Sequence, residues 1–367
     1  MKVPNHVIDV LYKLNLSQEV EPECFGRAFF SILNNSNPSI RDPIFWNFLY
    51  RLLPNGLTAD HVVELIKAVH DFDDFSIEQS LKVSLPNNNP LIGVVGSGKK
   101  GVKTFNISTT SALVASSLGV YVAKLGSCAT SSLTGSVDFM RSVGANVDLP
   151  TLEMIKILQK TGFGFFSIEK SIPMFDNIYG GKALTPNSLS FGLPALITPV
   201  KFDKVFYGIS HPAIDISARV LKKFGIEDAL IFSCTHNNTL YIDEIGVYGA
   251  TKIIEINKGK IQSQMCFQPR DLNIPNYKPK YVMQKNSKAA NIKCAIKVLS
   301  GYGEAACEDF ICINVAFLLR FAGITSDLKE GYHQAQLAIR KGLALEKLEE
   351  FVEITGGNKK VLKGYLE

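Results

Sequence analysis

The chain has 367 residues, 46% of them apolar, and a formal net charge of +5. This length suffices for one large domain plus a smaller one, and the apolar fraction supplies an ample core. The mild positive charge suits an anionic substrate and excludes the concentrated basic character of a dedicated nucleic-acid-binding protein. No stretch has the ~18 uninterrupted apolar residues that a membrane span needs, and the N-terminus lacks a signal-peptide core and cleavage site.

The seven cysteines are odd in number, scattered along the chain and never arranged as CxxC. This usage predicts a reduced, cytoplasmic protein without a structural zinc site. Cys128 lies in a polar loop, but no neighbouring histidine could act as its base, so a reactive thiol is not expected there.

Helices are predicted throughout the first 84 residues. Apolar residues recur at three- and four-residue spacing in residues 7–14, 22–35, 43–53 and 58–72. Thr58 is expected to cap the fourth of these helices. Their many aromatic side chains predict a core or a dimer interface rather than a ligand site. Residues 1–84 are therefore expected to form a small helical domain, which the polar stretch 85–90 links to the rest.

Residues 91–138 read as a strand, a glycine-rich turn, a helix, a second strand and a polar loop. The turn carries Gly93, Gly96, Gly98 and Gly101, and the polar cassette TFNIST follows at residues 104–109. A small-residue helix is expected over 110–118, and a strand over 120–123 that leads into Lys124. A loop rich in serine, threonine and glycine then continues to Asp138. This order is typical of a βαβ unit.

The same residue types predict a site for an anion. Glycines let backbone N–H groups approach an anion closely, and Ser108 and Thr109 stand at the expected N-terminus of a helix. Lys124 would add a positive charge. Hydroxyl donors would come from Ser131, Ser132, Thr134 and Ser136. Alternatively, Ser108 only caps its helix and the glycines only form turns. Two polar loops at the carboxyl ends of strands, facing one crevice, favour the anion site.

Alternating helices and strands continue to the C-terminus. Helices are expected at 149–162 and 211–225, strands at 163–170, 204–210, 228–234 and 251–262, and a final layer of helices at 288–301, 307–322, 326–341 and 344–354. Residues 171–200 are rich in proline and glycine and are expected to be a loop-rich crossover that packs partly on the helical domain. The tail 356–367 is expected to fray. The fold class is thus α/β, with a mixed or parallel central sheet in a domain formed by residues 90–170 and 201–360.

Two segments resemble the anthranilate phosphoribosyltransferase family, a branch of the nucleoside-phosphorylase-like phosphoribosyltransferases. TFNIST at 104–109 matches the family's cassette for the diphosphate and ribose, and KLGSCATSSLTGSVD at 124–138 is similar to its KHGNRxxSSxSGSxD loop. The resemblance extends, more weakly, from about residue 20 to residue 355. It implies a homodimer formed through the helical domain, and an active site in the cleft between the two domains that closes by a hinge near residues 85–92.

The resemblance also implies the substrate and metal sites. The donor would be 5-phosphoribosyl 1-diphosphate and the acceptor a small aromatic nitrogen compound. Adjacent carboxylates can share Mg²⁺, and the family has such a pair where this chain has Asp243 and Glu244. Asp243 and Glu244 would hold one Mg²⁺, while Ser108 and Glu244 would contribute to another. The implied substrate-binding residues are Gly93, Gly96, Ser97, Thr104, Asn106, Ile107, Ser108, Thr109, Lys124, Ser127, Ser131, Ser132, Ser136 and Lys182.

The sequence departs from the family mainly on the acceptor side. Aligned from Gly93, the family's GTGGD loop has Ser97 in place of its aspartate, with about two extra residues before the cassette. The His, Asn and Arg of the second loop stand here as Leu125, Ser127 and Cys128. The family's anthranilate-binding arginine has no clear equivalent, and Lys182 falls near its place. A lysine does not replace the bidentate guanidinium of arginine.

Two functions remain open from the sequence. The first is a Mg²⁺-dependent phosphoribosyltransferase, in which Phe105, Phe191 and residues 171–200 shape the acceptor pocket. The second is a non-enzymatic paralogue that binds nucleic acid through basic clusters at 99–103, 201–204 and 219–223. Pyrimidine-nucleoside phosphorylase activity is a more distant third. The Asp243-Glu244 pair together with the cassette favours the transferase, because a protein that only binds nucleic acid needs neither.

Overall fold

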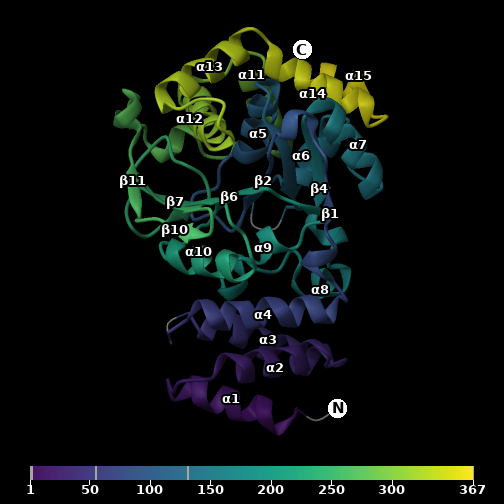
Figure 1. Ribbon diagram of the computed structural model, residues 1–367, viewed down its shortest axis with the longest axis vertical. Coiled ribbons are helices and arrows are strands. Elements are labelled where there is room, and N and C mark those ends of the chain that lie inside the picture. The colour runs from purple at the N-terminus through teal and green to yellow at the C-terminus, as the bar shows by residue number, and fades with distance from the viewer. Residues whose placement is uncertain (1–2, 54–55, 130–131, 367) are drawn as a thin grey trace.

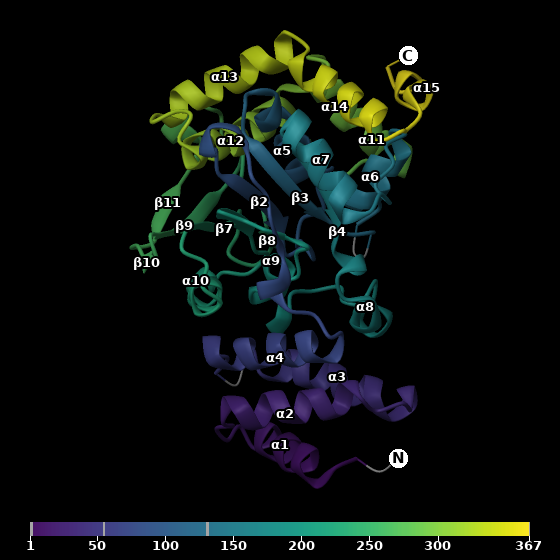
Figure 2. The same ribbon diagram turned by 45° about the vertical axis from the view of Figure 1, so that its right-hand side comes forward.

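The computed structural model describes residues 3–53, 56–129 and 132–366. A layer of N-terminal helices lies below an α/β body, and the C-terminal helices cover the top of that body (Figures 1 and 2). The N-terminal layer consists of α1 (Asn5–Asn15), α2 (Pro22–Leu33), α3 (Pro38–Arg51) and α4 (Ala59–Phe72).

Local sequence explains where these helices begin and how they pack. Thr58 Oγ1 accepts the backbone N–H of His61 at 3.4 Å, which confirms it as the N-cap of α4. Phe25, Phe29, Phe45 and Phe48 are fully buried and stack on one another between α2 and α3. The aromatic residues therefore form the core of the helical layer, which is one of the two roles, core or dimer interface, that the sequence predicted for them.

The body is built on a mixed sheet with the strand order β10-β9-β7-β6-β2-β3-β4. Five strands are parallel: β2 (Leu91–Gly96), β3 (Tyr121–Gly126), β4 (Phe163–Ser167), β6 (Lys204–Gly208) and β7 (Ala229–Thr235). Four more are antiparallel to their neighbours: β8 (Tyr241–Ile242), β9 (Ala250–Asn257), β10 (Lys260–Ile261) and β11 (Met265–Phe267). The central strands are almost wholly buried because helices cover both faces of the sheet.

Helices on one face of the sheet continue into the C-terminal layer (Figure 2). They are α5 (Ile107–Ser117), α6 (Ser136–Ser142), α7 (Thr151–Thr161), α11 (Lys288–Leu299), α12 (Ala305–Ala322), α13 (Leu328–Arg340), α14 (Leu343–Ile354) and α15 (Lys359–Lys363). On the other face, α10 (Ile214–Lys223) packs between the sheet and α4. This sandwiched sheet confirms the predicted fold class, a small helical domain plus a larger α/β domain. The residue boundaries of the two domains remain a prediction.

Residues 171–200 differ from the loop-rich crossover that the sequence predicted. They form α8 (Pro173–Tyr179), a 3₁₀ turn (Ser188–Phe191), α9 (Leu193–Leu196) and the start of β5 (Val200–Lys201), which pairs with β1 (Leu81–Lys82). Phe175 and Phe191 are fully buried, so the segment is packed. Pro173 and Pro194 stand in the first turn of short helices, where a missing N–H costs nothing. The proline density therefore marks helix starts here.

Three other expectations need correction. The cassette itself begins α5, at Ile107, and β3 continues to Gly126, so Lys124 lies within the strand. The expected strand 251–262 is a hairpin, because the chain turns with positive φ at Lys258 and Gly259. The tail does not fray: Leu362 of α15 is 1% exposed. Among the described residues, no helix combines the length and apolarity needed to cross a membrane.

Candidate active site

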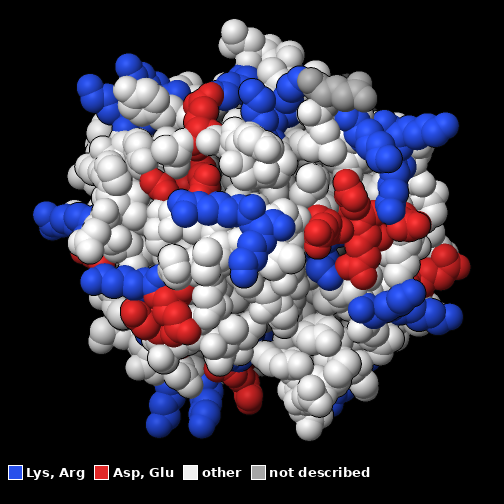
Figure 3. Space-filling view, turned by 90° about the horizontal axis from the view of Figure 1, so that it is seen from above, with Lys and Arg blue, Asp and Glu red and all other residues white. Residues whose placement is uncertain are grey.

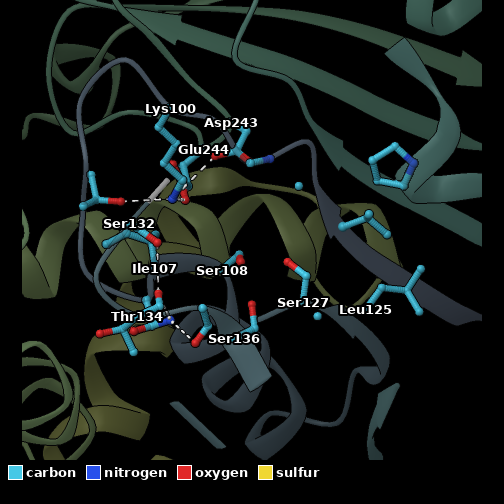
Figure 4. Close-up of a pocket in the computed structure, with 18 of the residues that line it drawn as sticks. Lys100, Ile107, Ser108, Leu125, Ser127, Ser132, Thr134, Ser136, Asp243 and Glu244 are labelled. Atoms are coloured by element: carbon cyan, nitrogen blue, oxygen red, sulfur yellow. Dashed lines mark hydrogen bonds and ion pairs between the residues drawn. The ribbon is translucent and has the colours of Figure 1, made fainter. Parts of the chain in front are cut away.

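Three segments far apart in the sequence meet at the carboxyl edge of the parallel strands. They are the turn after β2, the loop after β3, and the residues that follow β8. Ligands of open α/β sheets bind at this edge. Between the segments lies a pocket lined by Gly96, Gly98, Lys99, Lys100, Thr104, Asn106, Ile107, Ser108, Lys124, Leu125, Ser127, Ser132, Thr134, Ser136, Asp243 and Glu244, among others (Figure 4). We call it the donor pocket, after the phosphoribosyl donor that the resemblance implies.

Asp243 and Glu244 are buried at the back of the donor pocket, with 5% and 2% of their surfaces exposed. The Gly98 N–H donates to Asp243 Oδ2 at 2.7 Å. A Cβ at Gly96 would stand 2.4 Å from the same oxygen, and one at Gly208 would stand 1.8 Å from the Asp243 backbone oxygen. The acidic pair can therefore sit here only because these two strand ends are glycines.

Lys100 is the residue of this site that the sequence analysis missed. Its ammonium group forms an ion pair with Glu244, lies 3.5 Å from Asp243 Oδ1, and donates to Thr104 Oγ1 at 3.0 Å (Figure 4). Burial disfavours its charge, but the two carboxylates raise the pKa of Lys100 above its ordinary value. Burial, with Asp243 adding to it and Lys100 opposing it, raises the pKa of Glu244. The basic cluster at 99–103 thus holds a counterion for the acidic pair.

The structure also changes the alignment of the first glycine loop. Gly93 lies in the middle of β2 and faces Phe202, so the turn begins only after Gly96. Read from Gly96, the turn is GSGKK. Compared with GTGGD, this places Lys100, rather than Ser97, where the family has its aspartate. A positive charge thus replaces a negative one beside the acidic pair.

The cassette joins the two polar loops. Asn106 Nδ2 donates to the backbone oxygens of Gly135 at 3.2 Å and Thr134 at 3.4 Å, while its Oδ1 is buried without a hydrogen-bond partner among the described residues. Ser108 stands in the first turn of α5, and its side chain shares the pocket with Ser127 and Ser136 (Figure 4). A helix N-terminus without a side-chain cap, ringed by hydroxyl groups, suits a phosphate or diphosphate.

Lys124 lines the donor pocket from within β3 and is 2% exposed. Its ammonium group donates to the backbone oxygens of Val94, at 3.3 Å, and Leu125. Burial lowers the pKa of Lys124 to about 8. Its positive charge is therefore held by strand carbonyls, with the acidic pair further away.

Other expected site residues lie away from the donor pocket. Thr109 is 1% exposed and does not line it. Lys182 donates to the backbone oxygens of Asn177 and Ile178 at the end of α8, so its ammonium group is used within that helix. Ser131 lies outside the described residues. The structure brings together Gly96, Thr104, Asn106, Ile107, Ser108, Lys124, Ser127, Ser132, Ser136, Asp243 and Glu244.

A second cavity of about 300 Å³ adjoins the donor pocket. The two share wall residues and therefore form one continuous cleft; the shared residues are Gly96, Gly98, Lys99, Ser127, Cys128, Ile168 and Pro194. The second cavity extends toward α8 and is lined by Ser97, Ala129, Ile168, Glu169, Ile172, Phe175, Asp176, Tyr179, Ala183, Leu189, Leu193 and Ile197. We call it the acceptor cavity, after the acceptor that the resemblance implies. Of the aromatic residues expected to shape it, Phe105 lines the donor pocket, whereas Phe191 is buried and lines neither.

Comparison with known proteins identifies the family. Residues 88–345 match the profile described as "Glycosyl transferase family, a/b domain". The chain is 31% identical over 283 residues to the anthranilate phosphoribosyltransferase of Janthinobacterium sp. (strain Marseille), covering 76% of this chain and 79% of that one. It is 30% identical over 280 residues to that of Aquifex aeolicus (strain VF5), covering 76% and 80%. The chain belongs to the anthranilate phosphoribosyltransferase family. It is therefore a phosphoribosyltransferase, as the sequence predicted.

Solved structures of family members have the same fold. The anthranilate phosphoribosyltransferase of Thermus thermophilus superposes with a TM-score of 0.73 at 22% identity, over 95% of this chain and 99% of that one. The Saccharomyces cerevisiae enzyme, in complex with PRPP and Mg, gives a TM-score of 0.76 at 22% identity, over 96% and 98%. These matches confirm an N-terminal helical domain on an α/β domain in this family member.

The basic clusters of the alternative function are largely used within the protein. Lys100 belongs to the donor pocket, Lys204 donates to the Phe321 backbone oxygen at 2.7 Å, and Lys223 pairs with Asp60 at 2.7 Å. On the face of the molecule that the C-terminal helices cover, basic and acidic side chains are interspersed (Figure 3). Neither observation favours a surface for the nucleic-acid backbone, which needs clustered positive charge.

Proposed function

We propose that this enzyme transfers the phosphoribosyl group of 5-phosphoribosyl 1-diphosphate to the nitrogen of an aromatic amine and releases diphosphate with the help of Mg²⁺. The observation that carries this proposal is the buried Asp243-Glu244 pair, which faces the N-terminus of α5 across one pocket. Buried acidic groups opposite an anion site are expected where a metal ion joins the two.

The residues present fit a divalent cation. Glu244 Oε2 is buried and has no hydrogen-bond partner among the described residues, and the buried Asp243 Oδ1 has only the 3.5 Å ion pair with Lys100. Hard cations prefer such carboxylate oxygens, and Mg²⁺ commonly completes its shell with water and substrate phosphates. The described part of the chain has no group of three or more His, Cys, Asp or Glu that could hold a metal by itself. Ser108 and the diphosphate oxygens would therefore supply further ligands, and the ammonium group of Lys100 would move aside.

The side chains of the donor pocket can catalyse transfer by positioning the reactants, without a covalent intermediate on the protein. In the transfer, the acceptor nitrogen bonds to C1 of the ribose, the C1–O bond breaks with its electron pair leaving on diphosphate, and the nitrogen loses a proton to water. The free N–H groups of α5 and the hydroxyls of Ser108, Ser127 and Ser136 would hold the departing diphosphate. A bound Mg²⁺ would neutralise the negative charge that grows on this leaving group.

Calorimetry tests the donor site. We expect the wild-type protein to bind 5-phosphoribosyl 1-diphosphate only with Mg²⁺, and the double variant Asp243→Asn/Glu244→Gln to lose at least about 100-fold in affinity because its metal ligands become neutral amides. Asp148→Asn, which changes an exposed carboxylate paired with Arg141, is the matched control. Binding that does not depend on Mg²⁺, or that survives the double substitution, would sink the proposal.

Two further properties belong to the proposal. We propose a homodimer formed through the outer face of the helical layer, where Ile8, Tyr12, Leu16 and Phe30 are exposed on or beside α1 and α2. We also propose a cytoplasmic location, since all seven cysteines are free in the structure. Light scattering of the purified protein, before and after Tyr12→Asp, tests the dimer.

A further inference from the structure

We propose that the acceptor is an aromatic amine whose other ring substituent is neutral or cationic, and that Asp176 selects it against anionic compounds such as anthranilate. The proposal rests on the proposed function, because it takes the acceptor cavity as the place from which the nitrogen reaches the ribose. What carries it is the charge of the side chains that line this cavity.

Two carboxylates enter the acceptor cavity from neighbouring elements. Glu169 follows β4, and Asp176 lies in α8. Glu169 is held in place: its Oε1 accepts the Cys128 N–H at 2.7 Å, and its Oε2 accepts the Ser167 hydroxyl. The half-buried Asp176 carboxylate has no hydrogen-bond partner among the residues that the structure describes, and its charged neighbours are Glu169, Asp73 and Lys182. It is therefore the acidic group available to a ligand.

One cation lines the described walls of the acceptor cavity. Lys99 lies with its ammonium group 5.1 Å from the centre of the Tyr179 ring and donates to the Ser97 backbone oxygen at 3.4 Å. Lys182, which the sequence placed near the family's anthranilate-binding arginine, instead caps α8 and does not line the cavity. Among the lining side chains, two carboxylates against one lysine leave a net charge of −1. Outside the lining, Lys182 opposes the charge of Asp176, but the Asp73 carboxylate offsets Lys182. A carboxylate on the ligand would give up its hydrating water next to side chains of the same charge, and this desolvation costs binding free energy.

The rest of the cavity suits an aromatic ring. The Phe175 and Tyr179 rings stack with centroids 5.2 Å apart and form one wall, while Leu189, Leu193 and Ile197 add apolar surface. The volume of about 300 Å³ exceeds the ~150 Å³ of an apolar cavity that holds benzene. A substituted ring therefore fits, with its polar substituent toward Asp176 and its reacting nitrogen toward the donor pocket.

Three ortho-substituted anilines of similar size test the charge preference. Anthranilate carries an anionic substituent, 2-aminobenzamide a neutral one and 2-aminobenzylamine a cationic one. Binding is measured by calorimetry with Mg²⁺ and diphosphate present, which occupy the donor pocket without permitting transfer. We expect 2-aminobenzamide and 2-aminobenzylamine to bind at least about tenfold more tightly than anthranilate, a difference of ~1.4 kcal/mol.

Substitution of Asp176 tests whether this residue sets the charge preference of the cavity. Asp176→Asn keeps the shape and removes the charge, so we expect it to weaken 2-aminobenzylamine about tenfold, to strengthen anthranilate, and to leave 2-aminobenzamide within about twofold. Glu169→Gln serves as a second variant if Asp176→Asn does not fold, and it should move the three affinities in the same directions. Asp71→Asn, an exposed carboxylate on α4, is the matched control.

Two outcomes would overturn the inference. One is anthranilate binding as tightly as 2-aminobenzamide; the other is the same selectivity in wild type and in the folded variant. Mg²⁺-dependent donor binding, measured separately, would remain in either case and leave the proposed function standing. Loss of donor binding itself would instead count against the proposed function.

Discussion

The two halves of the cleft are built in different ways. The donor pocket depends on the backbone. Glycines let Asp243 approach two strand ends, and the N-terminus of α5 has no side-chain cap. The acceptor cavity depends on side chains carried by α8 and by the short turns around it. Backbone geometry tolerates few substitutions, whereas side chains on a fixed frame can be exchanged. A family member can thus keep its donor chemistry and change its acceptor.

Gly96→Ala should abolish most of the activity of the donor pocket. Its Cβ would stand 2.4 Å from Asp243 Oδ2, a distance that displaces the carboxylate. Because an error of about 1 Å in a catalytic group can cost ~100-fold in rate, we expect at least that loss in turnover and a matching loss of Mg²⁺-dependent donor binding. Gly364→Ala, where a new Cβ meets its neighbours at 3.6 Å or more, should leave both unchanged. Full activity in Gly96→Ala would show that the backbone argument is wrong.

The buried His70 makes the stability of the protein depend on pH. It lies on α4, is 6% exposed, and packs against Phe75 and Phe224. Burial lowers its pKa to about 4, although a hydrogen bond with the Leu196 backbone opposes this effect. The unfolded chain therefore binds a proton that the folded chain does not, and stability is lost as pH falls from about 6.5 toward 4.

Between pH 7 and pH 5, this histidine should cost about 2 kcal/mol of unfolding free energy, measured by urea titration. His211, whose pKa burial also lowers, adds to the loss. His70→Phe should remove this contribution to the pH dependence, while the exposed control His333→Gln should retain it. An equal pH slope in His70→Phe and wild type would exclude His70 as the cause.

Lys100→Met should raise the metal affinity of the donor pocket. The ammonium group of Lys100 occupies the position next to both carboxylates that a divalent cation needs. Removing this competing charge should raise the affinity for Mg²⁺, or for Mn²⁺ followed by electron paramagnetic resonance, about tenfold without donor present. It should also lower the melting temperature in metal-free buffer, because buried carboxylates lose their counterion. Lys99→Met removes a charge from the same turn but not from the acidic pair. Weaker metal binding in Lys100→Met would contradict the competition.

Local sequence patterns predicted much of the fold and most of the donor pocket. The spacing of apolar residues predicted α1 to α4, and the alternation of strands and helices predicted the sheet and its C-terminal cover. The cassette, the second polar loop and the Asp243-Glu244 pair predicted most of the residues that meet in the donor pocket. These features depend on local periodicity, on helix N-termini and on the carboxyl ends of strands, which a sequence displays directly.

Only the tertiary structure decided the position of Lys100, the packing of residues 171–200 and the charge of the acceptor cavity. Lys100 is separated from Glu244 by 144 positions, and a basic run gives no sign of which lysine will face a buried carboxylate. Asp176 and Lys99 come to one cavity because α8 packs under the turn after β2, whereas Lys182 turns back onto its own helix. Such contacts depend on packing between distant elements, and the sequence by itself does not determine which side chains share a cavity.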